Sequence, residues 1–222
     1  RNTWAWDHGS KRPRLARDAQ AQAAVIHASH PEMDGPYRLV CEGEPELLFT
    51  ENDSNTEHLY GAPNALPYVK DAFGEYLIHG RKDAVNPLEE GTKATAHYAL
   101  TLEAGASAVL RLRLTRTGTD RTPVAFEDFD RVFEARRREA DEFYATVIPD
   151  RLGGDSKDVM RQALAGMLWS KQWFHVDVRR WLEGDPTQPP PPPERKGGRN
   201  AEWTHLYNDD IVSMPDKWEY PW

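Results

Sequence analysis

Apolar and polar residues alternate over several short stretches between residues 37 and 116, which predicts β-strands. Residues 37–41 and 46–50 are rich in β-forming residues and are separated by a glycine and a proline. A loop crowded with turn-forming residues follows at 51–56, and residues 73–79 are expected to form a further strand. Short antiparallel strands with turns between them predict a β-sandwich.

The clearest pair of strands is expected at residues 94–102 and 108–116, which flank a turn at 103–106 and predict a β-hairpin. In the second segment leucine and arginine alternate, which is typical of a strand with one buried face. The residues expected on the buried side are Leu110, Leu112 and Leu114, with Arg111 and Arg113 on the other side.

Between Pro123 and Pro149 the apolar residues recur at helical spacing, with acidic residues early and arginines later, as the helix dipole favours. This pattern predicts one long helix. Asp155 and Ser156 then offer an N-cap to a second amphipathic helix that extends to about Leu168.

The change of period predicts an α+β chain in three parts. Residues 1–122 are expected to form an antiparallel β-sandwich, residues 123–150 a linker helix, and residues 151–222 the opening of a helical domain. Residues 1–36 carry no clear period, although the alanine-rich stretch 16–28 could form a short helix.

A proline run dominates residues 187–198 and ends at two glycines. Such a run is stiff and extended, and the glycines that follow it predict a hinge. The favoured interpretation is a loop that projects from a domain, with structured chain on both sides. The alternative is a ligand for a proline-recognition domain.

Composition excludes several classes of protein. The chain is 39% hydrophobic and 29% charged, a balance typical of soluble globular proteins, and its net charge of −8 argues against a binder of duplex nucleic acid. Cys41 is the single cysteine, which excludes an internal disulfide and a cysteine-based zinc site and fits a reducing, cytoplasmic location. No apolar run is long enough to span a bilayer, so no membrane is expected as a partner.

The stretch from residue 169 to residue 222 is unusually rich in tryptophan and in polar side chains. Flat aromatic rings interleaved with carboxylates, amides and guanidinium groups suit a polyhydroxylated ligand, because rings cover the C–H faces of a sugar and planar polar groups bind its hydroxyls. The alternative is a buried aromatic core, which is the commoner role of tryptophan. The tryptophans are Trp169, Trp173, Trp181, Trp203, Trp218 and Trp222.

Other motifs add little chemistry. His175 and Asp177 could bind a metal or form a structural hydrogen-bonded pair, and the structural interpretation is favoured because no third ligand stands at a suitable spacing. The sequence lacks the phosphate-binding, dinucleotide-binding and serine-hydrolase motifs. We therefore expect no metal and no cofactor.

Several blocks together resemble the N-terminal portion of bacterial glycoside hydrolase family 63 proteins, a group that includes processing α-glucosidases and mannosylglycerate-type hydrolases. The blocks follow the family's order and cover most of the chain, more weakly before about residue 36. They comprise residues 48–52, Asn64, 67–73, 86–87, 91–94, 169–185, 198–207 and 213–222.

The resemblance implies an N-terminal β-sandwich, a linker helix and the start of an (α/α)6 barrel. It also implies an inverting hydrolase, whose general acid and base stand roughly 6.5–9.5 Å apart. In the family pattern the acid follows the block that ends here at Trp222 and the base lies further on, so we expect a piece of a longer protein and assign no catalytic residue within it.

The expected substrate is an oligosaccharide or a small α-glycoside. On the resemblance, the residues expected to contact it are Trp218, Glu219, Tyr220 and Trp222, followed by Trp203 and His205. The acidic loop at 51–57 could cover the pocket as a lid. Two alternatives stay open: a carbohydrate-binding or structural sandwich without activity, and a phosphorylase-like relative that uses phosphate where water attacks.

Overall fold

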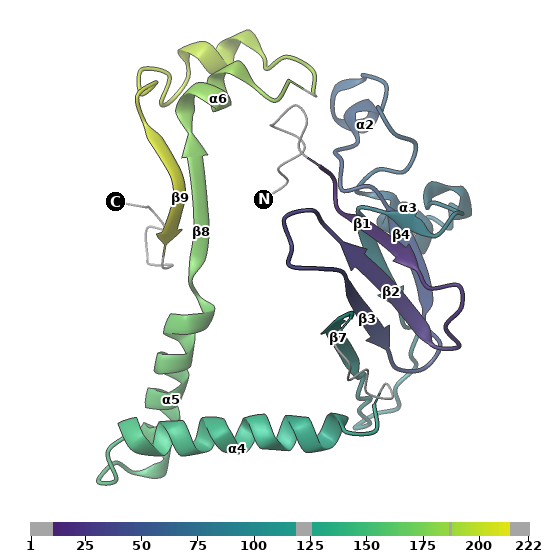
Figure 1. Ribbon diagram of the computed structural model, residues 1–222. Coiled ribbons are helices and arrows are strands. Elements are labelled where there is room, and N and C mark those ends of the chain that lie inside the picture. The colour runs from purple at the N-terminus through teal and green to yellow at the C-terminus, as the bar shows by residue number, and fades with distance from the viewer. Residues whose placement is uncertain (1–10, 119–125, 187, 214–222) are drawn as a thin grey trace. The chain divides into compact units, whose positions relative to one another are not determined.

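The computed structural model describes residues 11–118, 126–186 and 188–213, with the backbone alone at 172–175 and 209–213 (Figure 1). These residues form antiparallel sheets and several helices, so the fold is mixed α+β, as predicted. The chain divides into two compact units. The first comprises residues 1–129 with 186–189, and the second comprises residues 130–185 with 190–222.

An antiparallel five-stranded sheet forms one layer of the first unit, in the order β5-β1-β2-β3-β7. In its centre Val25 lies opposite Val40 and Ile26 lies opposite Leu39. The strands are β1 (Arg14–Arg17), β2 (Ala24–Ser29), β3 (Tyr37–Cys41), β5 (Glu90–Gly91) and β7 (Leu112–Arg116).

The suggestion of a short helix over residues 16–28 is wrong, because β1 and β2 occupy this stretch. The residues Ala24, Val25 and Ile26 are consecutive and all buried, on the two opposite faces of β2. A strand covered on both sides has no alternating pattern, so its sequence resembles that of a buried helix.

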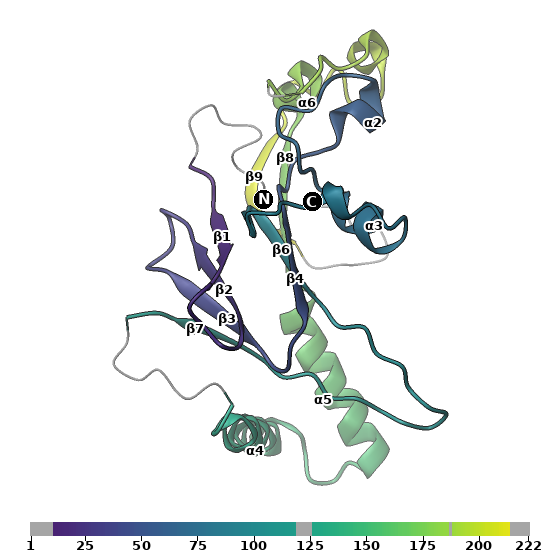
Figure 2. The ribbon, with the colours of Figure 1, turned by 90° about the vertical axis from the view of Figure 1, so that its right-hand side faces the viewer.

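A second, two-stranded sheet pairs β4 (Glu46–Thr50) with β6 (Lys93–His97). Leu47 and Phe49 of β4 pack against β2 and β3 of the larger sheet, where they meet Ala24, Ile26 and Cys41. The two sheets are therefore layers around one core, and Figure 2 shows them side by side, with β1, β2, β3 and β7 in one layer and β4 and β6 in the other.

The predicted hairpin between residues 94 and 116 is wrong, since β6 pairs with β4 whereas β7 pairs with β3. The intervening chain crosses from one sheet to the other. Its two ends are held at Glu42: the Tyr98 hydroxyl donates to the Glu42 carbonyl at 2.8 Å, and the Arg111 side chain donates to the Glu42 carboxylate at 3.0 Å. Alternation predicts a strand but does not identify its partner.

The expected burial of β7 is also reversed. Leu114 is 64% exposed and Leu110 and Leu112 are about half exposed, whereas the side chain of Arg113 is 12% exposed. Asp128 and Phe129 cover the arginine side of this edge strand, with Arg113 Nη2 2.6 Å from Asp128 Oδ1 and its guanidinium carbon 5.7 Å from the Phe129 ring centroid.

A helix over residues 72–77 replaces the strand that was expected at residues 73–79. Helix α3 (Ala72–Leu77) buries Ala72 and Tyr76, which stand one turn apart and pack with Leu48 and Val85 in a second apolar cluster. Spacing by four residues places both on one helical face. Two short elements flank this helix, α2 (Thr56–Tyr60) and the 3-10 helix η1 (Lys82–Ala84).

The second unit contains the two predicted long helices, α4 (Phe129–Val147) and α5 (Gly154–Trp169), and both are confirmed. The N-cap of α5 is Gly153 and not Asp155, which lies in the first turn. After α5 come β8 (Gln172–Asp177), α6 (Val178–Glu183), the 3-10 helix η2 (Pro193–Gly197) and β9 (Tyr207–Ser213), with β8 and β9 paired antiparallel.

Candidate functional site

Trp203 and His205 lie in the turn that leads from η2 to β9. Their rings stack, with centroids 5.9 Å apart and planes inclined by 18°. The turn is fixed by two backbone hydrogen bonds, from the Trp203 nitrogen to the Asn200 carbonyl at 3.0 Å and from the Leu206 nitrogen to the Trp203 carbonyl at 2.9 Å. The other predicted contact residues, Trp218, Glu219, Tyr220 and Trp222, lie outside the described residues.

The tryptophans whose side chains the structure describes are all exposed. Trp169, Trp181 and Trp203 expose 89%, 51% and 54% of their surfaces. A buried aromatic core therefore does not account for these three rings. Each presents apolar area at the surface, where a ligand or further protein can cover it.

Trp181 is held in place on α6. The guanidinium carbon of Arg195 lies 4.1 Å from the centroid of its ring, and Arg195 Nη1 donates to the Trp181 carbonyl at 3.2 Å. A guanidinium over an aromatic face is an attractive contact worth about 0.5–2 kcal/mol. This pair fixes the ring and covers one of its faces.

Asp177 has a structural role at the start of α6. Its Oδ1 accepts a hydrogen bond from the Arg180 backbone nitrogen at 3.2 Å, and its Oδ2 lies 3.5 Å from Arg180 Nε. A carboxylate at this position satisfies an otherwise unpaired helix N–H. The predicted hydrogen-bonded pair of His175 and Asp177 stays a prediction, because the His175 side chain lies outside the described residues.

Hydrogen bonds within the first unit hold the acidic loop that follows β4 in place. The Thr92 hydroxyl donates to Glu51 Oε2 at 2.7 Å and accepts from the Asn52 backbone nitrogen at 2.8 Å. Arg12 Nη1 donates to Asp53 Oδ2 at 2.7 Å, and the Lys70 nitrogen donates to the Asp53 carbonyl at 2.9 Å. Its suggested role as a lid remains a prediction.

Two asparagines then order the start of α2. Asn55 is the N-cap: its Oδ1 accepts from the His58 nitrogen at 3.0 Å and its Nδ2 donates to Asp71 Oδ2 at 3.0 Å. Asn64 Oδ1 accepts from the Thr56 nitrogen at 2.8 Å, and its Nδ2 donates to Asn55 Oδ1 at 3.1 Å. Sequence reasoning missed Asn55, although an N-cap asparagine followed by an acidic residue in the first turn, here Glu57, is a recognisable start of a helix.

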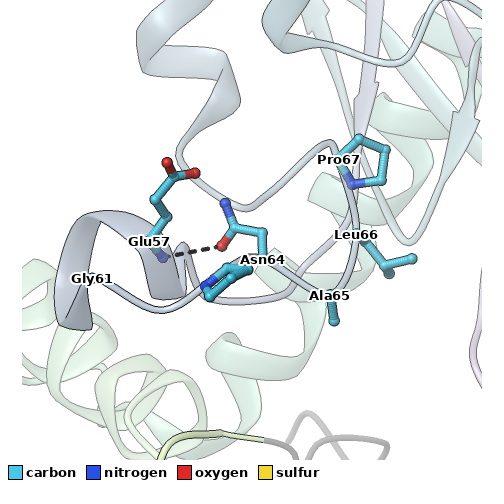
Figure 3. A pocket seen from close by; sticks show the side chains of 7 residues that line it. Glu57, Gly61, Asn64, Ala65, Leu66 and Pro67 are labelled. Atoms are coloured by element: carbon cyan, nitrogen blue, oxygen red, sulfur yellow. Dashed lines mark hydrogen bonds between the residues drawn. The ribbon is translucent and has the colours of Figure 1, made fainter.

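An open hollow of about 560 Å³ borders this network (Figure 3). Figure 3 shows the amide of Asn64 turned towards the backbone nitrogen of Glu57, from which it accepts a hydrogen bond at 3.3 Å. The wall combines one carboxylate, one amide and several small apolar residues. They are Glu57, Gly61, Pro63, Asn64, Ala65, Leu66 and Pro67.

A second hollow, of about 670 Å³, contains Glu46, Tyr76 and Lys82 in its wall. The Tyr76 hydroxyl donates to Glu46 Oε1, and His97 Nδ1 lies 3.3 Å from Glu46 Oε2. The hydrogen bond from Tyr76 is the main cause that holds the pKa of Glu46 below its usual value. Lys82 Nζ lies 3.6 Å from the centroid of the Tyr76 ring.

Within the described residues, no group of three or more histidine, cysteine, aspartate or glutamate side chains is arranged to hold a metal ion. Among the helices described, none has the length and apolar character needed to cross a membrane.

Comparison with known proteins shows that the chain is similar to part of a yeast protein. No protein-family model matches the chain, and no solved structure matches it significantly. The chain is 37% identical over 254 residues to the uncharacterized protein YMR196W of Saccharomyces cerevisiae. The match takes in all of this chain but 23% of the yeast protein, so the chain spans about a quarter of that relative's length.

Proposed function

We propose that this chain is the N-terminal part of an inverting glycoside hydrolase that acts on α-glucosides or related α-linked sugars. The observation that carries the proposal is the pair of stacked, exposed rings of Trp203 and His205. The C–H face of a sugar can pack on an exposed aromatic ring, and a neighbouring imidazole can form a hydrogen bond with a sugar hydroxyl.

The proposed architecture assigns a β-sandwich to residues 1–122, a linker helix to 123–150 and the start of an (α/α)6 barrel to 151–222. Two sheets that share one core support the first assignment. The exposed apolar residues of α5 support the last, because Val159, Met167 and Leu168 lie on a helix that further helices could cover. The greater length of the yeast relative leaves room for such helices.

In this proposal Trp218, Glu219, Tyr220 and Trp222 contact the sugar from the same part of the sequence as Trp203 and His205. The catalytic acid and base come from beyond residue 222, and no cofactor takes part. Inversion needs both carboxyl groups, since one protonates the leaving oxygen while the other activates water. The present chain supplies binding area and orientation, and we propose a cytoplasmic location.

A second candidate is a carbohydrate-binding module without catalytic activity. It is favoured by the fact that the Trp203–His205 stack is formed entirely by neighbouring residues of one turn. Binding through this stack would require no residue from another part of the protein.

Assays of the present chain and of the longer protein proposed to contain it separate these candidates. Both are incubated with a panel of α-glucosides and α-mannosides, released sugar is measured, and binding of the same sugars is measured by calorimetry. The hydrolase proposal predicts turnover by the longer protein alone. Binding by both proteins without turnover would favour the module, and turnover by the present chain would contradict the assignment of its missing acid and base.

A further inference from the structure

The prolines of the second unit form an extended segment that leads directly into η2. Residues 190–193 are all proline, and Pro192 has φ −61° and ψ 146°, the values of a polyproline II helix. At Pro193 the chain enters η2, which continues to Gly197. Residues 189–192 belong to no helix or strand, and at Pro192 the backbone has the polyproline II conformation, which needs no hydrogen-bonded partner.

Three side chains share one face of the segment. Both polyproline II and 3-10 helices repeat every three residues, so Pro190 and Pro193 lie on one face of the first helix and Pro193 and Lys196 on one face of the second. All three are exposed. Two proline rings and a lysine thus form a continuous exposed face, Pro190–Pro193–Lys196.

The other sides of the segment are anchored to α6 and its C-terminal cap. A Cβ atom added to Gly184 would lie 2.7 Å from Pro191 Cδ, so the proline ring packs directly on the glycine backbone. Arg195 stacks on Trp181 and donates to its carbonyl. These contacts hold the segment in its extended form while the Pro190–Pro193–Lys196 face stays exposed.

We propose that this face docks into the aromatic-lined groove of a proline-recognition domain of the SH3 type on a partner protein. Grooves of this kind receive prolines spaced by three residues, and a preformed polyproline II helix loses little entropy on binding. Lys196 pairs with an acidic side chain at the end of the groove. After the prolines, residues 194–199 carry three basic side chains (Arg195, Lys196 and Arg199) against one acidic side chain (Glu194), on a chain whose net charge is −8.

Calorimetric titration of the whole chain with purified SH3 domains tests the proposal. Half of these domains have an acidic groove rim and half have a neutral one. We expect the acidic-rim domains to bind, and the double substitution Pro190→Ala with Pro193→Ala to weaken that binding at least about tenfold. The matched control is Pro192→Ala, which removes an exposed proline from another face and should leave affinity within about threefold.

A second variant keeps the test valid if the double substitution disturbs the segment. Lys196→Glu preserves every proline, and we expect it to abolish binding to acidic-rim domains. Absence of binding by every SH3 domain at concentrations of about 1 mM would overturn the proposal. So would equal losses from Pro192→Ala and from the double substitution, or binding that Lys196→Glu leaves unchanged.

Discussion

Arg113 and Asp128 form an ion pair, with Nη2 2.6 Å from Oδ1, on the side of β7 where the sequence pattern predicted solvent. Asp128 stands just before α4, which begins at Phe129. The aromatic ring of Phe129 lies near the same guanidinium group. The pair therefore connects the edge of the larger sheet to the residues that introduce the long helix.

Loss of this pair should loosen the edge of the sheet. We expect Arg113→Ala to lower the local free energy of unfolding at β3 and β7 by about 1–3 kcal/mol, because the Asp128 carboxylate would remain in a partly buried position. Hydrogen exchange of the β3 and β7 amides measures this. Arg14→Ala is the control, since Arg14 pairs with Glu90 at 2.6 Å on the surface and should cost less than about 1 kcal/mol. Equal effects would contradict a special role for Arg113.

Asn64 should control the order of the segment around α2. Its Oδ1 accepts from the Thr56 nitrogen and hydroxyl at 2.8 and 3.0 Å, so Asn64→Ala leaves both donors without this acceptor. We expect the Thr56 and Glu57 amides to exchange about tenfold faster, in keeping with a loss of about 1–2 kcal/mol. His58→Ala, on the exposed part of the same helix, should leave exchange unchanged, and a similar acceleration in both variants would refute the assignment.

Much of the fold could be predicted from local pattern. The errors share one physical cause, which is that strand pairing and strand burial depend on tertiary contacts. The long helices were predicted because α4 and α5 repeat their apolar residues over many turns. The pairing of β6 and β7 was predicted wrongly, since Ala94 and Leu112 find partners far away in sequence, on β4 and β3. The leucines of β7 have the pattern of a buried face, but what covers a strand depends on tertiary contacts.

The candidate site could be predicted only in part. Trp203 and His205 were selected for their residue types, and their stacking follows from a turn that the sequence does not specify. The network of Asn55, Asn64 and Asp71 depends on side chains up to 16 residues apart meeting at one helix end. A linear pattern does not contain that proximity.

Acid should weaken the contact between Glu46 and Tyr76. The folded-state pKa of Glu46 lies below the ordinary value of 4.5, chiefly because Tyr76 donates a hydrogen bond to the carboxylate. A group with a lowered folded pKa stabilises the fold at pH values above its unfolded pKa, and this contribution disappears as the pH falls through the folded pKa. We therefore expect stability to decline below about pH 4.5 more steeply in the wild type than in Tyr76→Phe.

Carbon-13 NMR titration of the Glu46 carboxyl group checks this prediction. The pKa of Glu46 should rise in Tyr76→Phe and change less in Lys82→Gln, because the charge of Lys82 is a smaller cause of the shift. A pKa that stays the same without the Tyr76 hydroxyl would show that the hydrogen bond is not responsible.

The stacked rings should contribute to substrate affinity in the longer protein. Trp203→Ala removes the exposed apolar face, and we expect KM for an α-glucoside to rise about tenfold, which corresponds to a stacking contribution of about 1.4 kcal/mol. Trp203→Phe keeps an aromatic face and should recover most of the affinity. Circular dichroism establishes that both variants fold, and an unchanged KM in Trp203→Ala would remove the stack from the proposed site.

The central proposal is that this chain belongs to an inverting α-glycosidase, and the configuration of the released sugar tests it most directly. The longer protein is incubated with an α-glucoside in an NMR tube, and the anomeric proton of the first product is recorded before mutarotation. The account predicts that β-glucose appears first. Release of α-glucose first, or no release from any α-linked substrate, would contradict it.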